Sequence, residues 1–129
     1  NLLYAERATA REYAARARVE RVGDWQVVLL PPGEETTPAS IVLNEEYDVS
    51  AEIYRDGHNL GVRRYPGRSA PDLRRLAPHI PGWFVHSAGF LACWGNRASP
   101  ETTPPPNGTP QSGEELLALL KKVYGGQVP

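Results

Sequence analysis

The feature that most constrains the fold of this chain is the alternation of apolar and polar residues over residues 47–54, followed closely by Asp56 and Gly57. This alternation is typical of a strand with one buried face, and Asp-Gly is a favoured two-residue turn between antiparallel strands. A turn closed at this dipeptide sets Ile53 opposite Leu60, so the apolar residues of both strands share one face. We therefore predict a β-hairpin here, with its polar residues on the opposite face.

Three further segments come before this hairpin. Residues 2–22 hold neither glycine nor proline and are rich in strong helix formers, which predicts one long N-terminal helix that ends at Gly23. Residues 25–30 are a strand candidate, bounded by the prolines that follow. Residues 41–43 form a second short apolar run, which we group with the strand candidates.

Two short elements are predicted after the hairpin. Ser69 is a good N-cap and Pro78 is a stop, which predicts a short helix near residues 70–77. Residues 83–94 are the most apolar stretch, and Gly89 can supply the positive φ that a turn needs. We predict that this stretch forms a second hairpin that turns just before residue 90.

The C-terminal third of the chain is marked by proline. Residues 98–111 are Pro-rich and predict an extended, solvated linker. Ser112 and Glu115 form a capping-box pattern ahead of several leucines, which predicts an amphipathic helix over residues 112–125. The sequence therefore divides into a single domain over residues 1–97, the linker, and a C-terminal helix docked on the same domain or on a partner.

Together these segments predict an α+β fold. The chain of 129 residues is long enough to bury one hydrophobic core without disulfides or a structural metal. We expect the long N-terminal helix to pack on an antiparallel sheet of about four to six strands. The short helix near residues 70–77 and the C-terminal helix complete the architecture.

The composition excludes several classes of protein. The formal net charge is −1 at pH 7, so the chain as a whole is not a polybasic nucleic-acid coat. The single cysteine excludes a disulfide within the chain. No apolar run approaches the ~18–20 residues of a membrane helix, and we expect a soluble chain without a membrane span. Because methionine is absent, the sequence leaves open whether an N-terminal segment, a leader or an anchor has been removed.

The charges are strongly segregated along the sequence. Residues 34–52 hold six acidic and no basic residues, whereas residues 55–75 hold six arginines and two aspartates. The predicted hairpin sets Ser50 opposite Arg63, so part of the positive charge meets the acidic strand. We predict that the chain is a small module that binds another protein, with nucleic acid as the alternative partner. The predicted contact residues are Tyr54, Arg55, Arg63, Arg64, Tyr65 and Arg68.

A catalytic role is the weaker hypothesis. The chain contains no GxSxG, HExxH or phosphate-binding glycine motif, and the spacing of His79, His86 and Cys93 matches no metal motif. Cys93 and His86 would approach each other across the second hairpin, which leaves a small thiol-dependent enzyme as a further alternative. No cofactor and no metal is predicted. The sequence leaves open the partner, the oligomeric state, the compartment, and whether three tryptophans belong to the core or to an interface: Trp25, Trp83 and Trp94.

Overall fold

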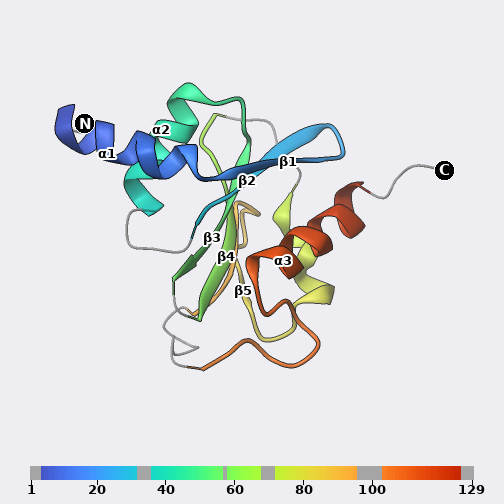
Figure 1. The fold of residues 1–129 in the computed structure, drawn as a ribbon. Helices are drawn as coiled ribbons and strands as arrows, with labels where there is room; N and C mark the ends of the chain where they lie inside the picture. Colours follow the sequence, from blue (N-terminus) through green and yellow to red (C-terminus); the bar gives the residue numbers. More distant parts are fainter. Residues whose placement is uncertain (1–3, 32–35, 57, 68–71, 96–102, 126–129) are drawn as a thin grey trace.

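A single sheet with helices on both faces organises the molecule (Figure 1). The computed structural model describes residues 4–31, 36–56, 58–67, 72–95 and 103–125. Helices α1 and α2 cover one face of the sheet, here called the α1/α2 face, and α3 with the 3₁₀ helix η1 covers the other, the α3 face. In chain order the elements are α1 (Tyr4–Ala15), β1 (Arg18–Val22), β2 (Trp25–Leu29), α2 (Thr36–Glu46), β3 (Ala51–Asp56), β4 (Asn59–Arg64), η1 (Leu73–His79), β5 (Phe84–Val85), β6 (Leu91–Trp94), α3 (Gly113–Leu120) and the π-type turn η2 (Lys121–Gly125).

The sheet is mixed. Its six strands are ordered β1-β2-β3-β4-β6-β5, and all neighbours are antiparallel except β2 and β3, which run parallel with Val27 opposite Ala51. The α+β class is therefore confirmed, but a purely antiparallel sheet is not. The parallel pair arises because the long connection from β2 to β3 carries α2 and returns the chain to the same end of the sheet.

The prediction of a long N-terminal helix is wrong. Helix α1 ends at Ala15 after 12 residues, and Arg18–Val22 forms β1 instead. Strand β1 pairs along its whole length with β2 across a two-residue turn at Gly23 and Asp24, where Gly23 takes a φ of 62°. Pairing with β2 outweighs the weak local preference of arginine and glutamate for a helix, because propensity is only a prior that tertiary contacts override.

The β3–β4 hairpin is confirmed, but its strand starts later and its turn lies elsewhere. Strand β3 begins at Ala51, so residues 47–50 of the predicted strand precede it. Asp56 pairs with Asn59 and is the last residue of β3 rather than the first residue of the turn. Gly57, the other predicted turn residue, lies outside the described residues.

This difference moves the pairing of β3 with β4 by two residues. Ile53 lies opposite Val62 rather than Leu60. A shift of two leaves every side chain on its predicted face, because the side-chain period of a strand is two. It does change the cross-strand partners, so that Arg63 lies opposite Glu52.

The apolar run at residues 41–43 is helical rather than extended. It lies in α2, where Val42 and Leu43 are fully buried among the side chains that α1 and α2 contribute to the core of their face. Three apolar residues are too few to distinguish a strand from one turn of a buried helix. Arg7 and Arg11 of α1 bind the end of α2 at Glu45 and Glu46, over 2.6 and 2.7 Å respectively.

The short helix after the hairpin starts later than predicted. Ser69 lies outside the described residues, and Asp72 is the N-cap of η1, its carboxylate accepting the Arg74 N–H at 2.9 Å. Pro78, the predicted stop, lies inside η1. The fixed φ of proline suits a helical backbone, so a proline near the end of a short 3₁₀ helix removes at most one backbone hydrogen bond.

The second predicted hairpin is confirmed. Strands β5 and β6 pair with Phe84 opposite Cys93, and the Gly89 N–H donates to His86 O at 2.9 Å to close the turn. Gly89 has a φ of 79°, the left-handed conformation that the predicted turn requires.

The described part of the Pro-rich segment packs onto the protein. Trp83 donates its indole N–H to Thr109 Oγ1 at 3.2 Å, and Trp94 donates to Thr103 O at 2.7 Å. Pro105 and Pro110 are buried, so the expected solvation of this segment does not hold at these positions. The first two tryptophans, Trp25 and Trp83, are core residues, and the third, Trp94, is half-buried.

Helix α3 packs against β3 and β4. Ser112 caps it, accepting the Glu115 N–H at 3.2 Å, and three leucines of α3 join the core of the α3 face. No helix within the described ranges is long and apolar enough to cross a membrane. The buried leucines of α3 are Leu116, Leu117 and Leu120.

We expect the free energy of unfolding to fall as the pH rises from about 10 towards about 12. Tyr124 of η2 lies edge-on to Trp25 and donates its hydroxyl to Asp72 O at 2.6 Å. Burial raises the pKa of Tyr124 from 10.0 to about 12. The unfolded chain therefore loses this proton first, and stability that is complete below the unfolded pKa is lost as the pH climbs towards the folded value. Burial also raises the pKa of Tyr54 and Tyr65, which act in the same direction.

Urea titrations at about pH 8 and about pH 11 measure this fall directly. Tyr124→Phe should show a smaller fall than the natural chain over the same interval. A free energy of unfolding that stays constant across this interval would contradict the burial of these hydroxyls.

Candidate functional site

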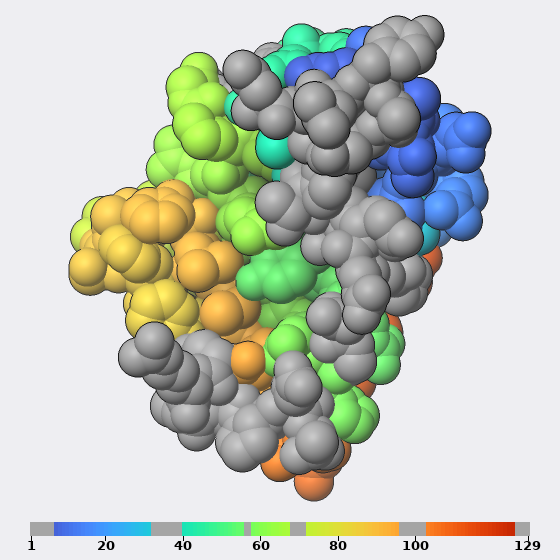
Figure 2. All heavy atoms as spheres, turned by 90° about the vertical axis from the view of Figure 1, so that its left-hand side faces the viewer, coloured from blue at the N-terminus to red at the C-terminus, as the bar shows by residue number. Residues whose placement is uncertain are grey.

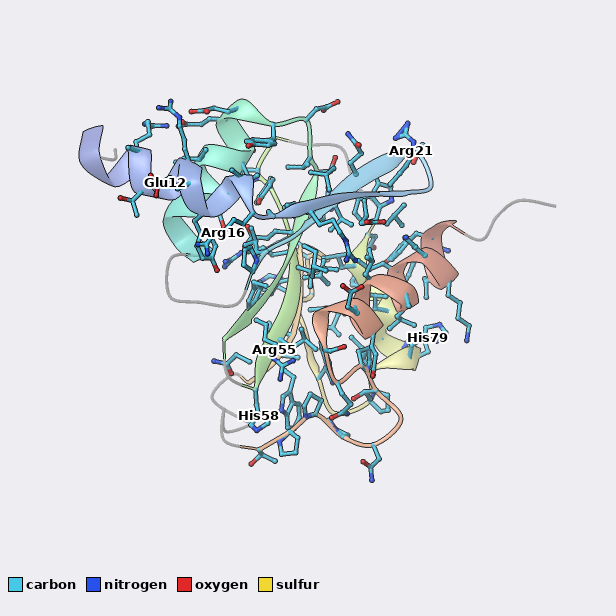
Figure 3. All side chains as sticks on the ribbon, viewed as in Figure 1. Glu12, Arg16, Arg21, Arg55, His58 and His79 are labelled. Carbon is cyan, nitrogen blue, oxygen red and sulfur yellow. The ribbon has the colours of Figure 1, made fainter. Side chains whose placement is uncertain are left out.

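The predicted contact residues do not form one exposed face. Tyr54 and Arg63 project to the α1/α2 face, and Tyr65 is buried in the core of that face. Arg55 follows Ile53 by two residues, so it lies on the α3 face near the tip of the hairpin (Figure 3). Arg68 lies outside the described residues.

The centre of the site is Glu52 of β3, whose side chain is completely buried. Its carboxylate accepts hydrogen bonds from Ser40 Oγ of α2, from Tyr65 Oη at 2.7 Å and from Arg63 Nε at 2.6 Å. Burial, and next the Glu52 carboxylate, raise the pKa of Tyr65 above its usual range, so the phenol keeps its proton and donates it. These partners replace the water that a buried carboxylate loses, and they tie α2 to the sheet.

Arg63 is the only cation that contacts Glu52 among the described residues, and it is held on two sides. Its Nε pairs with the carboxylate, and its guanidinium carbon lies 4.6 Å from the centre of the Tyr54 ring. The Arg63 side chain nevertheless keeps 39% of its surface exposed. One edge of the guanidinium is therefore fixed inside the protein while part of the side chain meets solvent.

A groove of about 470 Å³, here called the α2 groove, opens beside this ion pair. One wall is formed by residues 40–45 of α2, and the other is the end of β4 with the start of β6. Its volume is within the range of small-molecule and side-chain pockets, ~300–1,000 Å³. Arg64, the remaining predicted contact residue, also lines it. The lining residues are Ser40, Ile41, Asn44, Glu45, Arg63, Arg64, Tyr65, Pro66, Phe90 and Leu91.

Exposed aromatic side chains gather on the β5–β6 hairpin at the rim of the α2 groove. Phe84 and Phe90 are 40% and 45% exposed, and both rings contact the ring of His86, with centroids 6.0 and 4.1 Å away. Figure 2 shows the α1/α2 face, where this hairpin, in yellow and orange, projects at the left-hand edge next to the end of β4. Phe90 lines the groove and Phe84 does not. A large exposed apolar ring at a groove is the kind of anchor that protein interfaces use.

The proposed thiol site does not assemble as a nucleophile with its base. Cys93 is buried and interacts with the Tyr54 hydroxyl, while His86 Nδ1 accepts the Ala88 N–H at 3.0 Å. Burial raises the pKa of the Cys93 thiol, which favours the unreactive protonated form at neutral pH. Within the described residues, no hydrogen bond joins Cys93 to His86.

The remaining histidines lie away from the α2 groove. Figure 3 places His58 at the tip of the β3–β4 hairpin and His79 on η1, beside α3. In the part of the chain that the structure describes, no group of three or more histidine, cysteine, aspartate or glutamate side chains could hold a metal ion.

Replacing Gly61 by alanine is expected to destabilise the chain by about 1–3 kcal/mol. A β-carbon at Gly61 would lie 2.5 Å from Tyr54 Oη and 2.8 Å from the Cys93 β-carbon. Tyr54 can swing away only by leaving Arg63, and the Cys93 β-carbon is fixed by the backbone. Thermal unfolding checks this, with Gly67→Ala as the control, because Gly67 has open space around it although its positive φ adds some strain. Equal melting temperatures for Gly61→Ala and the natural chain would contradict the close packing of Tyr54.

Sequence reasoning missed the two residues that define the site, Glu52 and Phe90. Glu52 was one of six acidic residues in a block, and only the shifted hairpin register sets it opposite Arg63. Its position on the polar side of an alternating strand gave no sign of burial, since α2 covers that side. Phe90 could have been found as the residue that follows the predicted turn glycine, where a phenylalanine has little core to enter.

Comparison with known proteins shows a similar fold and indicates no function. No protein family model and no curated protein matches the chain. The fold is similar to a crystal structure of an uncharacterized protein from Helicobacter pylori G27, with a TM-score of 0.52 and 11% sequence identity over 95% of this chain. The match covers 33% of that structure, so this chain spans about a third of its length. At this identity the similarity concerns the arrangement of the backbone alone.

Proposed function

We propose that the chain is a protein-binding module that holds an apolar side chain of its partner in the α2 groove. The observation that carries the proposal is the exposed Phe90 ring at the rim of this groove. Apolar anchors in a pocket with a polar rim are the usual source of affinity in protein interfaces. Ile41 and Leu91 extend the apolar lining, and Glu45 and Arg63 add charged groups to it.

The arrangement supports a protein partner more than a nucleic acid. A nucleic-acid surface needs arginines free for phosphates and aromatic rings free for bases. Here Arg63 is paired with Glu52, Tyr65 is buried, and the ring of Tyr54 is covered by the Arg63 guanidinium. These contacts leave neither Tyr54 nor Tyr65 free to stack on a base, which removes the aromatic part of the nucleic-acid hypothesis.

The test is selection of a random peptide library, displayed on phage, on the immobilised full chain. We expect an enriched group of peptides that share an apolar residue. Synthetic copies should bind Phe90→Ser about 10- to 30-fold more weakly than the natural chain, the loss typical of an interface anchor. Phe84→Ser is the matched control, since Phe84 is about equally exposed on the same hairpin but does not line the groove.

Two outcomes would overturn the proposal. The first is that no related group of peptides is enriched. The second is that enriched peptides bind Phe90→Ser as tightly as they bind the natural chain and Phe84→Ser, which would place the binding surface elsewhere.

A further inference from the structure

The guanidinium of Arg63 has an unused edge. Its Nε is bound to Glu52, and among the described residues neither of its terminal nitrogens has a hydrogen-bond acceptor. Arg63 lines the α2 groove, and its side chain is 39% exposed. The terminal N–H groups of an arginine form a fork that matches a carboxylate in two parallel hydrogen bonds.

This edge is already held in place before any partner binds. The Glu52 carboxylate fixes Nε from one side, and the Tyr54 ring lies against the guanidinium plane. Glu52 in turn is fixed by Ser40 and Tyr65. A donor that is fixed in advance loses little conformational entropy on binding, which raises the affinity for an acceptor of the right shape.

Among the described residues, the charged side chains around the α2 groove are balanced by partners, and the free edge of Arg63 is the donor that remains. Glu52 balances Arg63, and Glu45 on the α2 wall is bound to Arg7 at 2.6 Å. Arg64 also lines the groove, but it lies opposite Ala51 on the α3 side of β4, and its charge helps to lower the pKa of Asp72 at the start of η1, so it is not the groove's free cation. The terminal N–H groups of Arg63 are therefore the part of the groove that an anion would bind.

We propose that the α2 groove recognises a peptide segment in which an aspartate or glutamate lies next to a large apolar residue. The carboxylate binds the free edge of Arg63, and the apolar side chain lies against Phe90, Ile41 and Leu91. This inference rests on the proposed function and adds the chemistry of the partner, since a neutral apolar peptide would fill the groove without using Arg63.

The peptides selected on the natural chain test this directly. We expect an acidic residue one to three positions from the apolar anchor, within reach of both groups. Replacing that residue by its amide, glutamate by glutamine or aspartate by asparagine, should weaken binding about 10- to 100-fold, as loss of a charge-assisted hydrogen bond does. This comparison needs no variant of the protein.

Arg63→Lys provides the matching change on the protein. A lysine can keep the ion pair with Glu52, but its single ammonium offers no second edge to the groove. On Arg63→Lys, the loss between the acidic and the amide peptide should be clearly smaller than on the natural chain. A cooperative thermal unfolding transition is the check that Arg63→Lys is folded.

The outcomes separate the two proposals. Enriched peptides that depend on Phe90 but carry no acidic residue would overturn this inference and leave the protein-binding function standing. A loss between acid and amide that is the same on the natural chain and on Arg63→Lys would overturn the role of Arg63. If no peptides are enriched, both proposals fail.

Discussion

Replacing Leu116 by alanine is expected to lower the free energy of unfolding by about 2–5 kcal/mol. Leu116 is completely buried between α3 and the sheet, in the cluster that includes Ile53 and Leu60. Truncation removes the transfer free energy of the lost methyl groups and leaves a cavity that the rigid sheet cannot close. Urea unfolding of the full chain measures the change.

The matched control is Leu119→Ala on the same helix. Leu119 is only partly buried and packs at the edge of the cluster. We expect less than half the loss that Leu116→Ala causes. If both variants lose the same small amount, α3 does not hold its place on the sheet in solution.

Replacing Arg63 by alanine is expected to destabilise the chain by about 2–4 kcal/mol. The buried Glu52 carboxylate would lose Arg63, the one cation that contacts it among the described residues. This value lies below that for a fully buried pair, because Arg63 is partly exposed and water can reach its place. Ser40 and Tyr65 would still donate to the carboxylate. Thermal and urea unfolding measure the loss.

The double variant Arg63→Ala with Glu52→Gln separates the charge from the packing. A neutral glutamine needs no cation, so the double variant should be more stable than Arg63→Ala alone. Should the second substitution bring no recovery, the loss would come from the packing of the arginine stem rather than from the uncompensated carboxylate.

The β structure could be predicted where local pattern and turn chemistry agree. The alternation of apolar and polar residues predicts β3, and Gly89 predicts the β5–β6 turn. Both signals come from residues that are neighbours in the sequence. Strand β1 was missed because its residues favour a helix locally and only pairing with β2 makes them extended. Gly23 and Asp24 form the turn between β1 and β2, but a glycine at this position is equally typical of the residue that ends a helix.

The site was predicted only in part, because its geometry depends on the register of β3 with β4 and on what covers them. The sequence drew attention to Arg63 and Tyr65 as exposed contact residues, whereas Tyr65 is buried and Arg63 is only partly exposed. A register that differs by two residues pairs Arg63 with Glu52 instead of Ser50. The position of α2 over this pair, which buries Glu52 and forms the groove, depends on a long connection that local patterns do not describe.

The order of the strands has a consequence for how the chain folds. The sheet consists of three local hairpins, β1–β2, β3–β4 and β5–β6, joined side by side at the β2–β3 and β4–β6 pairs. Isolated hairpins form in ~1–10 μs, whereas the two joints need long loops to close and are slower. The connection to β3 carries α2, so formation of the β2–β3 pair brings α2 onto the α1/α2 face. The connection to β5 carries η1, which packs on the α3 face. We therefore expect the α2 groove to form only after both joints have closed, late in folding.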